Sequence, residues 1–161
     1  MFRKIQWVVL GLVVLAQPVW AEEGGDGGPT SLPMLQKQCQ MLVSNTRQAY
    51  DQARALSTGG GMEKNAILHL RDMLHDAQDL WNVTRKSGST LDDIRESFDL
   101  LYDGHQLVKA GYPFLHAYTK RRLYFDRMDR SVGSVRFYYC QLWGQSPELP
   151  DVCWAYGGFP D

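Results

Sequence analysis

Four histidine and aspartate side chains stand close together in one segment of this chain. His69, Asp72 and Asp76 follow one another at spacings of three and four residues, which places them on one face of a helix, and His75 lies beside them. Imidazole and carboxylate groups bind divalent transition metals. The spacing therefore predicts a candidate metal site, although a solvated polar helix face commonly has the same pattern, and both interpretations stay open.

Other signatures of chemistry are missing from the sequence. There is no CxxCH for a c-type haem, no histidine late in the last helical segment for a b-type haem, and no Glu-x-x-His for a di-iron bundle. The GxSxG, HExxH, P-loop and GxGxxG motifs are also lacking. His105 falls on an apolar stripe, where we expect a hydrogen-bonded core histidine. We therefore predict no cofactor and no enzymatic activity.

The N-terminal segment predicts export. Arg3 and Lys4 precede an apolar run that ends before Gln17, and the run is too short to span a bilayer, which takes about 20 residues. Residues 1–21 are therefore interpreted as a cleavable signal peptide of bacterial type. We expect a periplasmic or extracellular protein that starts near Glu22 and has no membrane span after cleavage.

Charge bears on the partners of the exported chain. The whole sequence has 17 Lys and Arg against 18 Asp and Glu, and loss of Arg3 and Lys4 takes the net charge from −1 to −3. Nucleic-acid binding usually needs a basic surface, so we expect no nucleic-acid partner. The segment at 22–31 holds four glycines and is interpreted as a flexible leader.

Four helical segments are predicted over 32–141, because apolar residues recur at alternating spacings of three and four. Ser31 is expected to cap the first, Thr90 and Asp93 to form a capping box at the third, and Gly133 to weaken the fourth. The expected ranges are 32–57, 63–86, 89–110 and 114–141. The expected inward stripes are Leu35, Cys39, Leu42, Thr46, Ala49, Ala53 and Leu56; Ile67, Leu70, Leu74, Ala77, Trp81 and Thr84; Leu91, Ile94, Phe98, Leu101, His105 and Val108; and Leu115, Tyr118, Phe125, Met128, Val132, Val135 and Tyr139.

Matched helix lengths and short connections predict an all-α fold, an up-down-up-down four-helix bundle. The main alternative is a three-helix core with a detached first helix. The third segment is acidic and the fourth is basic. The basic run is interpreted as a solvated face paired across to the acidic helix, with an anion site as the alternative.

Three cysteines allow one internal disulfide in an exported chain. The bundle topology brings Cys39, Cys140 and Cys153 to one end. We favour a Cys140–Cys153 disulfide with Cys39 as a buried thiol, and pairing of Cys39 with either of the others remains the alternative.

The segment at 142–161 holds three prolines and a Gly-Gly pair, so we expect a short non-helical tail that packs on the bundle. Its aromatic residues form a candidate interaction patch. They are Trp143, Trp154, Tyr156 and Phe159.

These features favour a non-enzymatic exported helical bundle that acts through protein–protein contacts, for example as an accessory or assembly factor of the cell envelope. Its partner would be another envelope protein. The alternative is a periplasmic protein that binds a metal or a small ligand, through the His69 segment or through a pocket near His105.

Overall fold

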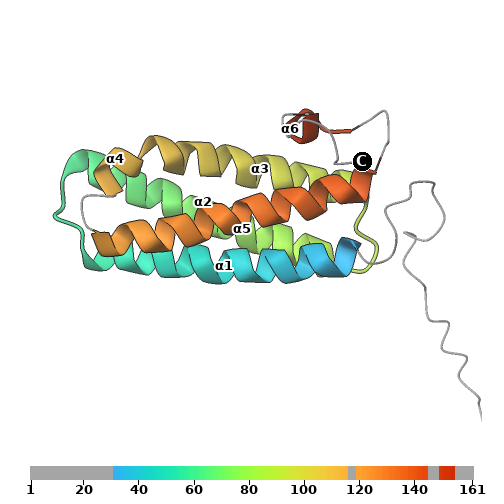
Figure 1. Ribbon diagram of the computed structural model, residues 1–161, viewed down its shortest axis with the longest axis horizontal. Helices are drawn as coiled ribbons and strands as arrows, with labels where there is room; N and C mark the ends of the chain where they lie inside the picture. The colour runs from blue at the N-terminus through green and yellow to red at the C-terminus, as the bar shows by residue number, and fades with distance from the viewer. Residues whose placement is uncertain (1–30, 116–118, 145–148, 155–161) are drawn as a thin grey trace, which may run out of the picture.

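The computed structural model describes residues 31–115, 119–144 and 149–154. Its long helices are α1 (Ser31–Ala55), α2 (Gly61–Arg85), α3 (Leu91–Ala110) and α5 (Thr119–Trp143), and its short helices are α4 (Tyr112–Leu115) and α6 (Asp151–Trp154). The four long helices run side by side in alternating directions (Figure 1). The predicted all-α bundle is confirmed. The predicted signal peptide, and all of the predicted leader except Ser31, lie outside the described residues.

Local chemistry accounts for the start of α3. Thr90 is the N-cap, and its hydroxyl accepts a hydrogen bond from the Asp93 amide at 3.1 Å. The Asp93 carboxylate accepts one from the Thr90 amide at 2.7 Å. This reciprocal pair satisfies two backbone donors that the helix leaves free, as the sequence predicts for a capping box.

A buried carboxylate holds the turn between α1 and α2. Glu63, in the first turn of α2, is 7% exposed and accepts hydrogen bonds from the Thr58 amide and the Thr58 hydroxyl, both at 2.8 Å. A carboxylate at this place also interacts favourably with the positive end of the helix dipole. The sequence analysis did not identify this role.

The core follows the predicted stripes closely in α1, α3 and α5. In α1 the exception is Leu56, which is 37% exposed because the helix ends at Ala55. In α2 four of the six predicted positions are buried, Leu70, Leu74, Ala77 and Thr84. Ile67 and Trp81 are half-buried, and the fully or almost fully buried apolar side chains that the prediction missed are Ala66, Met73 and Leu80.

Glycine lets α3 approach α2 closely. A Cβ added at Gly104 would lie 2.9 Å from Oδ2 of Asp76, and one added at Gly111 would lie 2.7 Å from Cβ of Ala66. The Cβ of Ala66 is fixed to the α2 backbone, so Gly111 limits the spacing of the α2–α3 pair. The Asp76 carboxylate is the end of a flexible side chain and can move away from Gly104.

Aromatic side chains fill the space between α3 and α5. Phe98 stacks on Tyr139 with the ring centroids 3.9 Å apart and the planes within 9° of each other. Tyr102 lies against Phe98 on one side, and Trp143 meets Tyr139 edge-on at 6.4 Å. These large, oriented rings contribute to stability beyond the area that they bury.

The predicted helix over 114–141 differs from the structure at its ends. Helical structure begins earlier, with α4 at Tyr112, and α5 runs on to Trp143, while residues 116–118 between α4 and α5 lie outside the described residues. Gly111 is the C-cap of α3, and its amide donates to the carbonyls of Leu107 and Val108. Pro113 then occupies the first turn of α4, where its missing N–H is not needed. Tyr118 lies outside the described residues.

The predicted non-helical tail over 142–161 is wrong in part, because some of its residues are helical. Residues 142–143 belong to α5, and α6 forms a single turn after Pro150. The disulfide between Cys140 and Cys153 is present, as predicted, and it ties α6 to the last turns of α5. The guanidinium of Arg136 also donates to the carbonyl of Val152. Among the described residues, none of the helices has the length and hydrophobicity needed to cross a membrane.

The disulfide should stabilise the fold by restricting the unfolded chain. It joins residues 13 apart in sequence, and we expect its loss to lower the free energy of unfolding by about 2 to 4 kcal/mol. Urea denaturation of a Cys140→Ala/Cys153→Ala variant measures this effect.

A Cys39→Ala variant is the matched control, because it removes a cysteine and keeps the disulfide. The wild type and this control should both lose stability when a reductant is added, whereas the double variant should not respond. Equal urea midpoints for the double variant and the oxidised wild type would contradict the prediction.

Candidate functional site

A buried polar cluster links α3, α4 and α5. Nε2 of His105 lies 2.8 Å from Oδ1 of Asp129, and the hydroxyl of Tyr112 donates a hydrogen bond to the same oxygen. His105 is 7% exposed. The prediction of a hydrogen-bonded core histidine is confirmed, and the cluster is made of one residue from each of the three helices.

The cluster favours an ionised carboxylate. Burial raises the pKa of Asp129, but the hydrogen bonds from His105 and Tyr112 outweigh this effect, so that the pKa lies below its usual range. Burial and the neighbouring Asp129 carboxylate together raise the pKa of Tyr112 well above its ordinary value. Tyr112 therefore stays protonated and acts as a donor.

The cluster resembles part of a hydrolytic triad, but its second ring nitrogen contacts no nucleophile. A triad needs one histidine nitrogen on the carboxylate and the other on the attacking hydroxyl or thiol. Nδ1 of His105 is buried and has no hydrogen-bond partner among the residues that the structure describes. The cluster is therefore suited to fastening three helices together.

The remaining thiol is also poorly suited to nucleophilic attack. Cys39 is free and fully buried in α1, where burial raises its pKa to about 12. The thiolate, which is the reactive form, is then scarce at neutral pH.

The four candidate metal ligands on α2 do not converge. Asp72 pairs with its neighbour Arg71 at 2.8 Å, Asp76 lies against Gly104 of α3, and His75 is exposed. His69 is half-buried. Across the described ranges, no three or more His, Cys, Asp and Glu side chains are grouped so that they could hold a metal ion.

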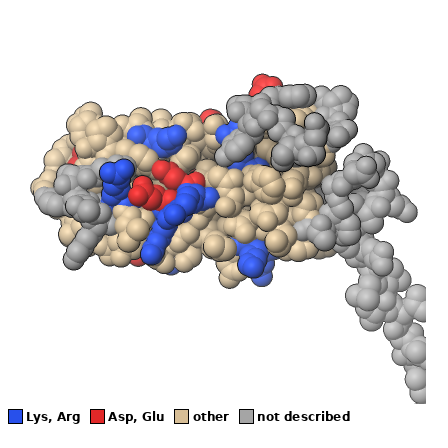
Figure 2. Space-filling model, viewed as in Figure 1, with Lys and Arg blue, Asp and Glu red and all other residues tan. Residues whose placement is uncertain are grey.

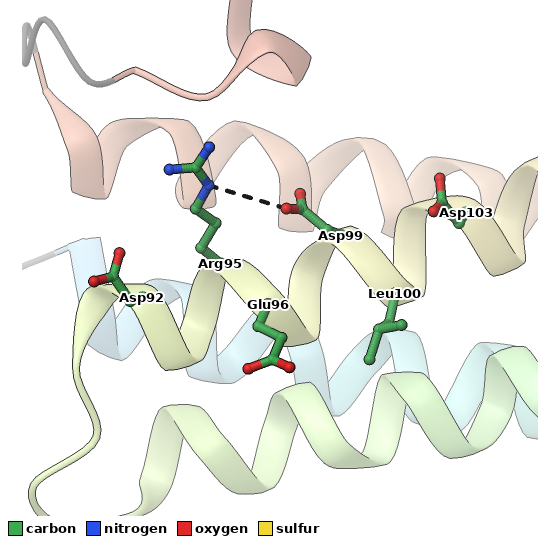
Figure 3. A pocket seen from close by; sticks show the side chains of 6 residues that line it. All are labelled: Asp92, Arg95, Glu96, Asp99, Leu100 and Asp103. Carbon is green, nitrogen blue, oxygen red and sulfur yellow. Dashed lines mark ion pairs between the residues drawn. The ribbon is translucent and has the colours of Figure 1, made fainter.

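Acidic side chains instead gather on the outward face of α3. They border an open depression of about 430 Å³, which is lined by Asp92, Arg95, Glu96, Asp99, Leu100 and Asp103. Figure 3 shows that Arg95 and Asp99 point toward the α5 side of the helix, whereas Glu96 and Leu100 point toward the α2 side. The depression is a shallow surface feature along one helix.

One carboxylate of this face, that of Asp99, is paired with an arginine of the same helix. Arg95 is 4.0 Å from Asp99, and both side chains are about half-exposed. Partial burial raises the pKa of Asp99 and nearby Asp103 raises it further, whereas Arg95 lowers it; the net direction is upward. An upward shift means that the ionised carboxylate is disfavoured where it stands.

Two exposed leucines lie among these charges. Leu100 is 59% exposed and Leu107 is 52% exposed, and their spacing of seven residues puts them on one side of α3. We name this surface the acidic stripe, and it consists of Asp92, Glu96, Asp99, Leu100, Asp103 and Leu107. Neither leucine was predicted as a contact residue from the sequence, although both lie off the predicted inward stripe.

Two basic residues of α5, Arg122 and Arg130, make contacts other than the predicted ones. Arg122 lies 4.0 Å from Asp126, and Nε of Arg130 donates to the Asp126 carbonyl, so both contacts stay within α5. The predicted pairing across to the acidic helix is wrong for these two residues. Figure 2 shows blue and red side chains intermixed on the surface of the molecule.

The aromatic tail residues are divided by the structure. Trp143 is 6% exposed and packs in the core against Tyr139, with the guanidinium of Arg95 over its ring at 5.8 Å. Its side chain is therefore unavailable for an exposed patch, because it closes the aromatic stack. Trp154 belongs to α6, whereas Tyr156 and Phe159 lie outside the described residues.

Comparison with protein-family models, with curated proteins and with solved structures finds no match to this chain. The functional proposal therefore rests on the sequence and on the geometry of the described residues.

Loss of Asp129 should uncouple the three helices. An Asp129→Ala variant leaves Nε2 of His105 and the hydroxyl of Tyr112 without their acceptor, and we expect it to lower the free energy of unfolding by about 1 to 3 kcal/mol at neutral pH. The neighbouring Asp126→Ala, which removes an exposed contact to Arg122, should cost only a few tenths of that.

The direction of the Asp129 pKa shift determines how its contribution to stability depends on pH. Because the folded pKa of Asp129 is depressed, its stabilisation is complete above the unfolded value of about 3.9 and is lost as the pH falls through the lower folded value. Denaturation of both variants between pH 7 and acid measures this. A stability difference between Asp129→Ala and wild type that stays constant into strong acid would contradict it.

Proposed function

We propose that this protein is an exported, non-enzymatic helical bundle that acts by binding another protein of the cell envelope, as an accessory or assembly factor. One observation carries the proposal: the acidic stripe combines two exposed leucines, Leu100 and Leu107, with exposed carboxylates on the same face of α3. Exposed apolar side chains set among polar ones are typical of protein-binding surfaces.

The interior supports this proposal, because it offers little to a small ligand. The core side chains are packed against each other over the full length of the four helices. The buried His105 is bonded to Asp129, and the Asn45 side chain of α1 donates to the Ser131 hydroxyl of α5 at 2.6 Å. The depression on α3 is open and follows the surface of that helix.

The proposal of export rests on the N-terminal sequence and on the cysteines. A disulfide such as Cys140–Cys153 forms and persists in oxidising compartments. The charged and apolar parts of residues 1–21 have the order of a secretory signal peptide. Together these features favour the periplasm or the extracellular space as the place of action.

Site-specific photocrosslinking tests the proposed contact surface. A photoreactive amino acid placed at Leu100 or Leu107 in the exported full-length chain should give discrete crosslinked products in the native host, because these side chains lie within the acidic stripe. Products are resolved by gel mobility and identified by mass spectrometry.

Met62 is the matched control, since it is apolar and 60% exposed, but belongs to α2 and not to the acidic stripe of α3. We expect no comparable product from Met62. The same products at all three positions, or none from Leu100 and Leu107, would contradict the proposed surface.

A further inference from the structure

We propose that the partner of the acidic stripe is a second copy of this chain, bound through the outward face of its α5. This inference rests on the proposed function, in which the acidic stripe is a contact surface. It adds the identity of the partner and the face that the partner presents.

The outward face of α5 carries the opposite charge. Leu123, Arg127, Arg130, Ser134 and Phe137 recur at alternating spacings of four and three residues, so they lie along one side of the helix. Leu123 and Phe137 are each 48% exposed, and Arg127 and Arg130 are exposed between them. We name these five residues the basic stripe.

The two stripes are complementary in composition. The acidic stripe has four carboxylates and no basic residue, and the basic stripe has two arginines, Arg127 and Arg130, and no carboxylate. Each stripe also contributes two large apolar side chains. Opposite charges around exposed apolar residues provide both attraction and buried area at an interface.

Contacts inside one molecule leave much of this charge available. Arg95 pairs with Asp99 within α3, and Arg122 pairs with Asp126 within α5, in each case at 4.0 Å between half-exposed or more exposed side chains. Exposed pairs of this kind contribute little energy. Contacts with a partner that excludes water from the stripes would therefore contribute more binding free energy than is lost when these intrahelical pairs are broken.

The arrangement of the stripes allows two kinds of assembly. α3 and α5 belong to the same bundle (Figure 1), so a two-fold dimer can pair the acidic stripe of each copy with the basic stripe of the other. A head-to-tail contact instead closes into a ring or continues as a chain of copies. We therefore expect association that grows with concentration and weakens with salt.

Sedimentation velocity of the purified, oxidised chain tests this. The wild type should associate at about 0.01 M salt and dissociate at about 1 M, where the Debye length falls from about 30 Å to about 3 Å. An Asp99→Lys/Asp103→Lys variant and an Arg127→Glu/Arg130→Glu variant should each associate about tenfold more weakly or not at all.

Mixing the two variants is the decisive step. The lysines on α3 of the first variant face the glutamates on α5 of the second, so the mixture should regain association that neither variant shows alone. Asp51→Lys/Asp79→Lys is the matched control, because it makes the same change in net charge at exposed sites on α1 and α2. It should associate like the wild type, and circular dichroism verifies that each variant is folded.

A wild type that stays monomeric at low salt and high concentration overturns the inference, and so does a folded mixture that fails to associate. If the wild type is monomeric while Leu100 still crosslinks to a different protein, the proposed function stands and only the second copy is excluded. A Leu100 product made of two identical chains would support the acidic stripe as a contact surface and a second copy as its partner.

Discussion

The packing of α5 between α1 and α3 is the constraint on which the rest of the bundle depends. Toward α1, α5 presents Ser131, which accepts a hydrogen bond from Asn45 at 2.6 Å. Toward α3 it presents Tyr139, which stacks on Phe98, and Asp129, which binds His105. Aromatic stacking and buried hydrogen bonds are both directional. They therefore fix the rotation of α5 about its axis as well as its position.

That rotation decides which residues face outward. With Phe125, Val132 and Tyr139 in the core, Arg127 and Arg130 have to lie on the surface. The same reasoning applies to α3, where burial of the stripe from Ile94 to Val108 turns most of the carboxylates outward. The charged stripes are thus a consequence of the aromatic and polar contacts inside, and the disulfide at α6 holds the last turns of α5 in that arrangement.

Local signals in the sequence predict most of the fold. The Thr90–Asp93 capping box and the Cys140–Cys153 disulfide follow from short-range chemistry and from topology, and both are present. The last long helical segment was predicted to start at residue 114, whereas α4 begins at Tyr112, because Pro113 is tolerated in the first turn of a helix. The stripe on α2 was predicted correctly at four of six positions, but Ile67 and Trp81 are half-buried while their neighbours Ala66 and Leu80 face the core. Helix period alone does not tell which of two adjacent apolar residues is buried.

The candidate site was less predictable, because it depends on contacts between segments far apart in sequence. The sequence placed His105 in the core, but its partners Asp129 and Tyr112 are identified only when α4 and α5 are packed against α3. Trp143 was assigned to an exposed patch, whereas the rings of Phe98 and Tyr139 leave a space that it fills. Side-chain exposure is a tertiary property, and spacing alone does not determine it.

The central claim is that the outward faces of α3 and α5 are the contact surfaces of this protein. Amide NMR spectra recorded on serial dilution at low salt test it residue by residue. The account predicts concentration-dependent shift changes over 92–107 of α3 and 122–137 of α5, with the outward residues of α1 and α2 unchanged. Changes centred on α1 or α2, or spectra that do not respond to dilution at all, would contradict it.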